Sequence, residues 1–303
     1  MTAVAAVDIG TNSVRLLITD NEGGELARHM RITRLGQGVD VTGTLAEEAI
    51  ARTTAVLQDY RAELRRFSVT RVRATATSAA RDAGNSEAFF AAAEQALGHR
   101  PTLLSGEEEA RLSFVGATTG LQAVAAGPYL VIDIGGGSTE FVLGQTGPEA
   151  LISVAMGCVR MTERHLHSDP PTAAEVTACV DDARAVLATV SERIPVARAQ
   201  TVVGLAGTIT TLCHLHLGLR VYDPSRSHRA RLRLADVEPL VSRLIESDLA
   251  ARRAWLMEPQ RAEVIVGGAI VLRTVMRELA IDELIVSEAD ILDGLAASLR
   301  AGP

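Results

Sequence analysis

Apolar and polar residues follow two patterns along the chain, and the patterns alternate. Segments of strand character and length occupy 4–7, 14–19, 25–32, 69–76, 129–132, 141–143, 150–155, 201–205 and 284–286. Segments with helical character occupy 45–67, 86–97, 106–124, 235–245, 261–279 and 291–299, with further helices starting near 159 and 172. Three strands in a meander precede alternating helices and strands, and this order occurs twice. The pattern predicts an α/β protein with two similar halves.

A turn signal separates the two halves. Gly127-Pro128 stands between the end of one helix pattern and the start of the next strand pattern. We therefore expect domains at 1–126 and 127–303. The chain has 303 residues, which is long enough for two domains that each have a hydrophobic core.

A glycine-rich stretch from Asp133 to Glu140 joins two of the predicted strands. Three successive glycines leave the turn without Cβ atoms, so its backbone N–H groups can lie against an anion. Asp133 and Glu140 add two carboxylates that suit a metal ion, held directly or through water. A tight turn without any ligand is the alternative interpretation, because glycine-rich hairpins are common.

The same stretch occurs a second time, and this favours the functional interpretation. Asp8-Ile-Gly-Thr-Asn-Ser-Val-Arg aligns without a gap with Asp133-Ile-Gly-Gly-Gly-Ser-Thr-Glu, 125 residues further along. Such a spacing is too long for a solenoid repeat. We expect each of two similar domains to offer one strand–turn–strand loop to a shared cleft, with a phosphate group between the loops.

Composition excludes several classes of protein. Apolar residues make up 47% of the chain and charged residues 22%, and the net charge is −7. We therefore expect no attraction to nucleic acid or to anionic membranes. The sequence has no run of 18 apolar residues and no signal-peptide pattern, so we expect a cytoplasmic protein. Cys158, Cys179 and Cys213 have no metal-ligand spacing and are expected to be reduced core residues.

Lysine is absent, and all 30 basic residues are arginines. This excludes the phosphate-binding loop that depends on a lysine, and every mechanism with a lysine Schiff base. A GC-rich genome explains the bias more simply than function does. Any side chain with a permanent positive charge that meets a phosphate must still be an arginine, whose planar fork suits this task.

Three adjacent acids open the helix pattern that follows Ser105. Ser105 and Glu108 have the spacing of a capping box, and Glu107 complements the helix dipole. Glu109 has neither function and lies on the helix face of Leu112. It is therefore the candidate general base of the three, and a surface acid is the alternative.

Three further stretches are candidates for anion binding. Gly204-Leu-Ala-Gly-Thr lies between a strand and a helix, where backbone N–H groups meet anions, although such a short motif is weak evidence. Arg81 ends a strand in a polar turn, and a solvated surface arginine is the alternative. The arginine-rich stretch 220–233, which includes His228, suits a long polyanion, or it is an ordinary solvated loop.

Taken in order, these stretches resemble the motifs of the exopolyphosphatase and guanosine pentaphosphate phosphatase family. The matching segments are D-I-G-T-N-S, T-S-A-A-R-D, S-G-E-E-E-A-R, D-I-G-G-G-S-T-E, G-L-A-G-T-I-T-T-L, Y-D-P with His228, and V-S-E-A-D-I-L-D-G-L. The resemblance covers nearly the whole chain. It implies an α/β fold with two ribonuclease-H-like domains around an interdomain cleft. This is the actin-like fold of sugar kinases, acetate kinase, heat-shock chaperones and actin.

The resemblance also implies functions for individual residues. Glu109 matches the glutamate that activates water, and Arg81 matches a phosphate-binding arginine. Asp133 and Glu140 match the acids that hold Mg²⁺ and water, and the repeat adds Asp8 as a metal ligand. Arg15 and Arg261 are similar in position to phosphate-contacting arginines. The loops and the resemblance together place phosphate contacts at Asn12, Ser13, Arg15, Gly135, Gly136, Gly137, Ser138, Thr139, Gly207, Thr208, His228 and Arg261.

The expected reaction is Mg²⁺-assisted removal of the terminal phosphate of inorganic polyphosphate, with water activated by Glu109. Guanosine pentaphosphate is the alternative substrate of the same reaction. A protein that senses polyphosphate or a nucleotide without catalysis is an alternative function of another class. The chain stops at Pro303, so we expect the additional C-terminal domains of longer relatives to be absent. A homodimer is one expected assembly.

Overall fold

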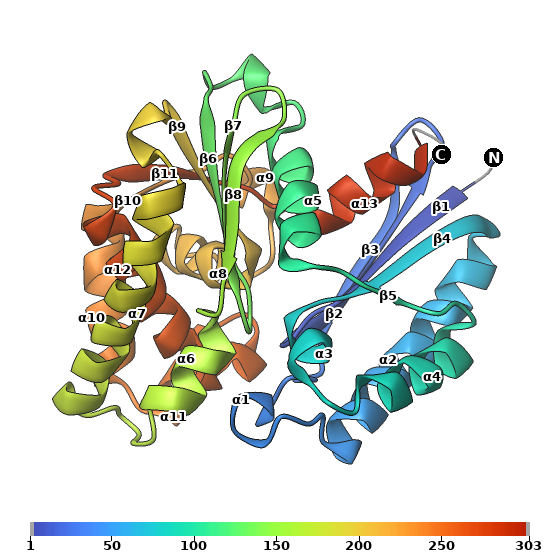
Figure 1. The fold of residues 1–303 in the computed structure, drawn as a ribbon, viewed down its shortest axis with the longest axis horizontal. Coiled ribbons are helices and arrows are strands. Elements are labelled where there is room, and N and C mark those ends of the chain that lie inside the picture. Colours follow the sequence, from blue (N-terminus) through green and yellow to red (C-terminus); the bar gives the residue numbers. More distant parts are fainter. Residues whose placement is uncertain (1–2, 301–303) are drawn as a thin grey trace. The chain divides into compact units, whose positions relative to one another are not determined.

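The computed structural model describes residues 3–300, and its contacts divide the chain into two units. Unit 1 comprises the described residues of Met1–Gly116 and Ile291–Pro303, and unit 2 comprises Ala117–Asp290. Each unit contains one β-sheet with helices packed against it (Figure 1).

Unit 1 has a five-stranded mixed sheet in the order β3-β2-β1-β4-β5. Its strands are β1 (Ala3–Ile9), β2 (Ser13–Asp20), β3 (Glu25–Ile32), β4 (Val69–Ala76) and β5 (Thr102–Leu103). The first three strands pair antiparallel as a meander, whereas β4 runs parallel to β1 and β5 runs parallel to β4. The carboxyl ends of β1, β4 and β5 therefore meet at one edge of the sheet.

Helices cover both faces of this sheet. They are α1 (Val39–Thr42), α2 (Glu47–Arg66), α3 (Ser78–Asp82), α4 (Ser86–Leu97), α5 (Gly106–Thr118) and α13 (Ile291–Arg300). In β1, Ala5 and Val7 face the core that includes residues of α2 and α4, whereas Ala6 faces Leu295 of α13. Figure 1 shows α13 on the opposite side of the sheet from α2 and α4. Because β1 is covered on both faces, it is a continuous apolar run instead of an alternating one.

Unit 2 repeats the same sheet order and adds one strand at the edge. Its strands are β6 (Tyr129–Ile134), β7 (Thr139–Gly144), β8 (Pro148–Val154), β9 (Thr201–Leu205), β10 (Arg231–Arg233) and β11 (Glu283–Val286). The order is β10-β11-β9-β6-β7-β8, so β8, β7, β6, β9 and β11 correspond to the five strands of unit 1. Both sheets thus have the ribonuclease-H-like order, and the expected fold class is confirmed at this level.

The helices of unit 2 pack with its sheet around a hydrophobic core that is larger than the core of unit 1. They are α6 (Cys158–His165), α7 (Ala173–Arg193), α8 (Ala206–His216), α9 (Pro224–Ser227), α10 (Leu234–Glu246), α11 (Leu249–Trp255) and α12 (Ile265–Glu278), with short 3₁₀ turns at Leu121–Ala123, Val196–Arg198 and Pro259–Glu263. All three cysteines are free thiols and buried, as expected. Burial raises the pKa of Cys179 and Cys213 to about 12, so both thiols stay protonated at neutral pH.

The structure corrects several expected boundaries. The units divide at Gly116 and Ala117, not at 126 and 127, and α13 belongs to unit 1 because its apolar face packs on β1 and β2. The helix expected at 106–124 ends at Thr118, and the helix expected at 261–279 begins at Ile265. The arginine-rich stretch 220–233 is not only a loop, because it contains α9 and β10.

Candidate active site

The two aspartate loops have the same backbone structure, each in its own unit. In the hairpin of β1 and β2, Asp8 lies opposite Arg15, and in the hairpin of β6 and β7, Asp133 lies opposite Glu140. The turn is closed by the Gly10 N–H to the Ser13 carbonyl at 2.9 Å, and by the corresponding pair of residues 135 and 138 at 3.0 Å. The repeat seen in the sequence is therefore a repeat of structure.

In the second loop the carbonyl groups accept hydrogen bonds from the segment 158–160, whereas some of the N–H groups stay available. The Gly135 and Gly136 carbonyls accept from the N–H groups of Cys158 and Val159 at 2.9 and 2.8 Å, and the Gly137 carbonyl accepts from Arg160 Nε at 2.8 Å. Within residues 3–300, the N–H groups of residues 136 and 137 donate to no backbone carbonyl. A loop with occupied acceptors and available donors is suited to bind an anion.

The first loop follows the same plan. The Thr11 carbonyl accepts from the Gly36 N–H at 2.8 Å, and the Asn12 carbonyl accepts from the Thr33 N–H at 3.0 Å. Several side-chain atoms of this loop are buried and have no hydrogen-bond partner among the described residues: Asp8 Oδ1, Thr11 Oγ1 and both amide atoms of Asn12. Buried polar atoms without partners are uncommon in proteins, and here they indicate a place for a ligand or water.

Gly157 allows the second loop to take its shape. A Cβ on this residue would lie 2.3 Å from the Gly136 carbonyl oxygen and 2.5 Å from the Gly137 nitrogen. Both contacts are with backbone, which cannot move aside as a side chain can. The requirement for glycine at this position comes from tertiary packing, and the sequence alone did not reveal it.

The two hairpins differ in charge at one cross-strand position. Arg15 Nη2 lies 2.6 Å from Asp8 Oδ2, so this buried carboxylate has a cation beside it. In unit 2 the opposite residue is an acid, and Glu140 Oε1 accepts from Ser153 Oγ at 2.7 Å. Asp133 and Glu140 are 7% and 1% exposed. Like charges directly opposite each other in a sheet are unfavourable, and a cation beside them lowers that cost.

These residues fit Mg²⁺ in part. The ion usually binds one or two carboxylates and completes its shell with water and substrate phosphate, which matches the acidic pair of unit 2. Among the described residues no group of three or more His, Cys, Asp or Glu side chains has the arrangement of a metal site. Asp8 already bonds Arg15 through Oδ2, but its Oδ1 is buried without a hydrogen-bond partner. The assignment of Asp8 as a direct ligand therefore stays a prediction.

Arg81 and Glu109 lie together in unit 1. Arg81 Nη1 donates to the Leu104 carbonyl at 2.9 Å and lies 3.3 Å from Glu109 Oε2. Arg81 follows β4 and Glu109 follows β5, so the chain brings both to the edge where Asp8 and its loop lie. Among the described residues, Nε and Nη2 of Arg81 have no hydrogen-bond partner. The guanidinium therefore still has donors for a phosphate.

The three adjacent acids at the start of α5 separate as predicted. Ser105 N–H and Oγ donate to Glu108 Oε2, both at 2.9 Å, and the Glu108 N–H donates back to Ser105 Oγ at 3.2 Å. Hydrogen bonds from the Ser105 backbone and hydroxyl lower the pKa of Glu108. Glu107 is exposed, whereas the Glu109 side chain is only 13% exposed. Glu108 thus caps the helix, whereas Glu109 lies largely buried beside Arg81, and its assignment as the general base stays a prediction.

The third candidate anion site lies at the start of α8 in unit 2. The Arg261 guanidinium rests on this turn, because a Cβ at Gly207 would lie 1.8 Å from Arg261 Nη1. Glu258 accepts from Arg261 Nε and orients the group. Ala206 has φ of +69°, a strained value for a residue with a Cβ. The predicted contacts Gly207, Thr208 and Arg261 are therefore close together.

Other predicted phosphate contacts are less well supported. The Thr139 hydroxyl donates to the Met156 carbonyl and the residue is fully buried, which argues against a contact between this side chain and phosphate. In the arginine-rich stretch, Arg231 and Arg233 both pair with Glu283 on the surface, so they are not free for a polyanion track. His228 lies beside Glu288, as described below.

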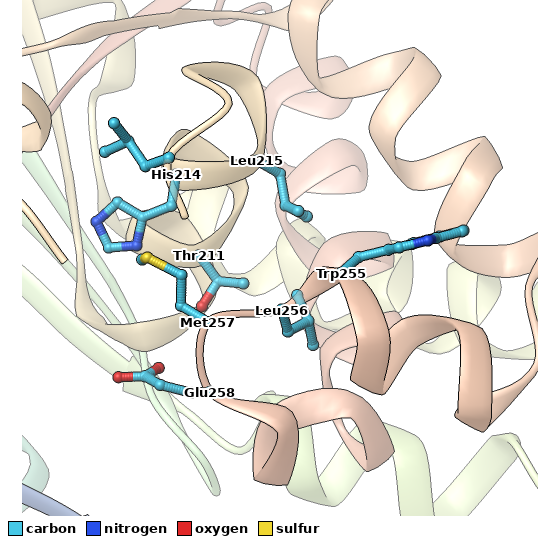
Figure 2. Close-up of a pocket in the computed structure, with 8 residues that line it drawn as sticks. Thr211, His214, Leu215, Trp255, Leu256, Met257 and Glu258 are labelled. Carbon is cyan, nitrogen blue, oxygen red and sulfur yellow. The ribbon is translucent and has the colours of Figure 1, made fainter. Parts of the chain in front are cut away.

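A small pocket that sequence reasoning missed lies in unit 2. Its lining residues are Thr211, His214, Leu215, Leu219, Trp255, Leu256, Met257 and Glu258 (Figure 2). These residues come from α8, the segment that follows it, and the last residue of α11 with the segment after it. The pocket adjoins the third anion site, because Glu258 also bonds Arg261. No spacing in the sequence linked these two segments, since only the packing of α8 and α11 brings them together.

The predicted site residues are divided between the units. Unit 1 holds Asp8, Asn12, Ser13, Arg15, Arg81 and Glu109. Unit 2 holds Asp133, Gly135, Gly136, Gly137, Ser138, Thr139, Glu140, Gly207, Thr208, His228 and Arg261. In each unit the predicted loop residues lie at or next to the carboxyl ends of the parallel strands, the usual ligand-binding edge of an α/β sheet.

Comparisons with known proteins agree with this architecture. Residues 17–300 match the model of the Ppx/GppA phosphatase family. The chain is 47% identical to exopolyphosphatase 2 of Mycobacterium tuberculosis, with 99% of each chain covered. It is 30% identical to a guanosine-5'-triphosphate,3'-diphosphate pyrophosphatase of Vibrio atlanticus, which covers 96% of this chain and 58% of that protein. The crystal structure of the Aquifex aeolicus member of the Ppx/GppA family superimposes with a TM-score of 0.81 at 33% identity, covering 100% and 99% of the two chains.

Between residues 3 and 300, no helix combines the length and apolar character that crossing a bilayer requires.

Proposed function

Because the chain belongs to the Ppx/GppA phosphatase family, we propose that it hydrolyses the terminal phosphate of inorganic polyphosphate and releases orthophosphate. The observation that carries this proposal is the pairing of Glu109 with Arg81 at 3.3 Å, at the edge of the unit 1 sheet where Asp8 and its loop lie. The pair supplies a carboxylate for water and a guanidinium for phosphate within one short distance.

The proposed reaction is a displacement at the terminal phosphorus. Glu109 accepts a proton from water as the water oxygen forms a bond to phosphorus. The bridging P–O bond breaks, and its electron pair leaves with the shortened chain. The products are orthophosphate and a polyphosphate one unit shorter, so atoms and charge balance. Arg81 holds a non-bridging oxygen of the phosphate and orients Glu109 through the same guanidinium.

The glycine loops bind charge in this proposal. Gly136 and Gly137 offer backbone N–H groups, and Asn12 and Thr11 offer buried side-chain donors that no described residue engages. Mg²⁺ bound by Asp133 and Glu140 would neutralise charge on the phosphate oxygens as the P–O bond breaks. Thr208 and Arg261 would contact a phosphate further along the chain.

Guanosine pentaphosphate is the second candidate substrate. The Vibrio atlanticus relative is named for a pyrophosphatase activity on a guanosine nucleotide of this kind, and its match covers 96% of this chain. The reaction at phosphorus would be the same, and only the group that leaves would differ. A sensor without turnover is a weaker candidate, because Glu109 and the acidic pair are all present.

Phosphate release from the purified protein with Mg²⁺ tests the proposal on three substrates: short polyphosphate, long polyphosphate and guanosine pentaphosphate. We expect orthophosphate from polyphosphate, and release that is slower by roughly 10²- to 10⁴-fold from the Glu109→Gln protein, which controls for contaminating phosphatases. Release only from guanosine pentaphosphate would replace the first candidate with the second. Binding of either substrate without any release would leave the sensor.

A further inference from the structure

Glu288 is a buried acid in unit 2 to which the proposed function assigns no task. It stands in the V-S-E-A-D segment directly after β11, and its side chain is 15% exposed. Tyr222 Oη donates to its Oε2 at 2.9 Å, and Ser227 Oγ donates to its Oε1. His214 Nε2 lies 3.4 Å from Oε1, within ion-pair range but without hydrogen-bond geometry. The carboxylate thus joins α8 to the segment 222–228.

The carboxylate is held in its ionised form. Burial raises the pKa of Glu288, but interactions with His214, Ser227 and Tyr222 together lower it by more than burial raises it. The net shift of the pKa is therefore downward. Glu288 therefore accepts hydrogen bonds at neutral pH. A carboxylate that accepts two hydroxyl groups can hold both in one geometry, which a neutral acid cannot do equally well.

This cluster lies next to the third anion site. β11 runs parallel to β9, with Val286 opposite Gly204, and the Ser287 N–H donates to the Gly204 carbonyl at 2.8 Å. Gly204 stands three residues before Gly207, on which the Arg261 guanidinium rests. Glu288 and the anion-binding turn therefore leave the sheet at the same edge.

The backbone of Glu288 determines the tautomer of His228. The Glu288 N–H points at His228 Nδ1 at 3.2 Å, and a backbone amide can only donate. Nδ1 must therefore accept, and the proton of the neutral ring must be on Nε2. A neutral histidine in this tautomer presents an N–H donor at Nε2.

Hydrogen bonds to neighbouring segments anchor the chain around His228, among them Arg229 Nη2 to the Gly120 carbonyl at 3.1 Å. Arg229 has φ of +68°, and its N–H donates to the Val286 carbonyl at 2.7 Å. The Val286 N–H donates to the Ala230 carbonyl at 2.8 Å. Tyr222 is 51% exposed, yet its hydroxyl is held by Glu288. A strained residue in an exposed segment persists only where the surroundings hold it in place.

We propose that Glu288 is a positioning residue for substrate binding: its carboxylate anchors Tyr222 and Ser227, and its backbone N–H holds His228 as the Nε2–H tautomer, which donates to a phosphate oxygen of the polyphosphate chain. The proposal rests on the proposed function, because it takes a phosphate chain as the ligand. Glu288 itself does not touch the substrate. Loss of the Glu288 carboxylate should therefore weaken the binding of polyphosphate more than it slows cleavage of the P–O bond.

The first test compares four variants by steady-state hydrolysis of long polyphosphate. Glu288→Ala should raise KM roughly 10-fold, the scale of one hydrogen bond to a charged group, with kcat within about twofold of the parent. His228→Ala should raise KM to a similar extent. The double variant should be no worse than either single variant, because both act through one contact. Glu149→Gln, which changes an exposed ion pair with Arg198 in the same unit, is the matched control and should behave as the parent.

The second test needs no activity. In the substrate-free protein, ¹⁵N spectra of labelled histidine should show His228 as the Nε2–H tautomer, and Glu288→Ala should convert it to a mixture of tautomers. Addition of tripolyphosphate should shift the Nε2 signal in the parent and not in Glu288→Ala. Because the spectra do not depend on turnover, they can support this proposal even if no substrate is hydrolysed.

Three outcomes would overturn the proposal. One is an Nδ1–H tautomer in the parent, and another is the same tautomer in the parent and Glu288→Ala. The third is a lower melting temperature in Glu288→Ala with an unchanged KM, which would make Glu288 a stabilising residue only. If Glu288→Ala does not fold, Tyr222→Phe and Ser227→Ala each remove one bond to the carboxylate. Both should then raise KM, and an unchanged KM in both would refute the anchoring function.

Discussion

The hairpins β1–β2 and β6–β7 have the same backbone structure but differ in the charge of the side chain opposite the aspartate. Both close the turn with the same hydrogen bond, and both have their loop carbonyls covered by the segment that follows the third strand. At the position opposite the aspartate, however, one has Arg15 and the other Glu140. One substitution within a repeated frame converts an ion pair into a pair of acids. This suggests that the units share a way of binding phosphate but differ in the cation that accompanies it.

The largest effect is expected from the base that only unit 1 carries. Glu109→Gln keeps the shape of the side chain but removes the basic carboxylate, so kcat should fall by roughly 10²- to 10⁴-fold. Polyphosphate binding should survive, because Arg81 and the loops remain. Both quantities can be measured by steady-state kinetics and by equilibrium binding of the inactive variant.

Glu108→Gln is the matched control for Glu109→Gln. Glutamine also serves at this position of a capping box, so kcat should stay close to that of the parent. If Glu108→Gln were the inactive protein and Glu109→Gln the active one, the assignment of the base would be wrong despite the observed geometry.

The next effect separates the two aspartates by metal dependence. Asp133→Asn should raise the Mg²⁺ concentration for half-maximal activity by at least roughly 10-fold, the lower end of what changes around metal ligands cost. Asp8→Asn should lower activity without this shift, because its partner is Arg15. A Mg²⁺ titration of both variants measures this difference.

Excess chelator provides the control for the metal experiment. It should abolish turnover of the parent, and addition of Mg²⁺ should restore it. Equal shifts in the two variants would instead make Asp8 a metal ligand like Asp133, as the repeat by itself predicts. Full turnover in chelator would remove the metal from the proposal.

A smaller effect is expected from two glycines at the anion loops of unit 2. Gly157→Ala forces a Cβ against loop backbone and should lower the free energy of unfolding by about 1–3 kcal/mol. Gly207→Ala meets only the end of the Arg261 side chain, which can move, so its unfolding free energy should change by less than about 1 kcal/mol. Its KM for polyphosphate should still rise, because the guanidinium is displaced. Urea unfolding and steady-state kinetics of both variants would show whether Gly157 acts on stability and Gly207 on substrate binding through Arg261. Equal unfolding free energies of the two variants would contradict this difference.

The smallest effect compares the capping box of α7 in unit 2 with that of α5 in unit 1. Glu175 accepts from the Thr172 N–H at 2.7 Å and from two further N–H groups, which lowers its pKa to about 2. The pKa is lower in the folded state than the value of about 4.3 in the unfolded chain. The stabilisation is therefore complete above that value and is lost as pH falls toward 2.

The melting temperature, measured from about pH 5 to about pH 2, reports this contribution. This range covers the pKa values of Glu175 in the unfolded and folded states. The parent should lose melting temperature more steeply than Glu175→Gln over this range. Glu108→Gln, in the capping box of α5, should behave in the same direction with a smaller change, because within residues 3–300 Glu108 accepts hydrogen bonds only from Ser105. Parallel curves for the parent and Glu175→Gln would contradict the assignment.

Local patterns were sufficient to predict most of the fold. The apolar runs located strands β1 to β4, β6 to β9 and β11, and the helical spacing located α2, α4 and α10 within a few residues. Strongly periodic segments can be read from sequence because their side chains choose a face locally. The short elements α3, α9 and β10 were missed, since three to five residues carry too little periodicity to stand out.

Within the candidate site, residue order and spacing were enough to predict the chemistry and to reveal the repeat. The two aspartate loops, the capping box that sets Glu108 apart from Glu109, and the restriction of cations to arginine all follow from residue order and spacing. These features are local, because a loop or a cap is made by residues close together in the chain.

Only the tertiary structure decided which partners these residues have. Arg81 meets Glu109 because β4 and β5 are neighbours, Gly157 must be glycine because a distant loop crosses it, and α13 joins unit 1 because β1 needs cover on its second face. The link between Glu288 and His228 spans 60 residues. Contacts between segments so far apart depend on how strands and helices pack, and a single sequence carries no local signal for them.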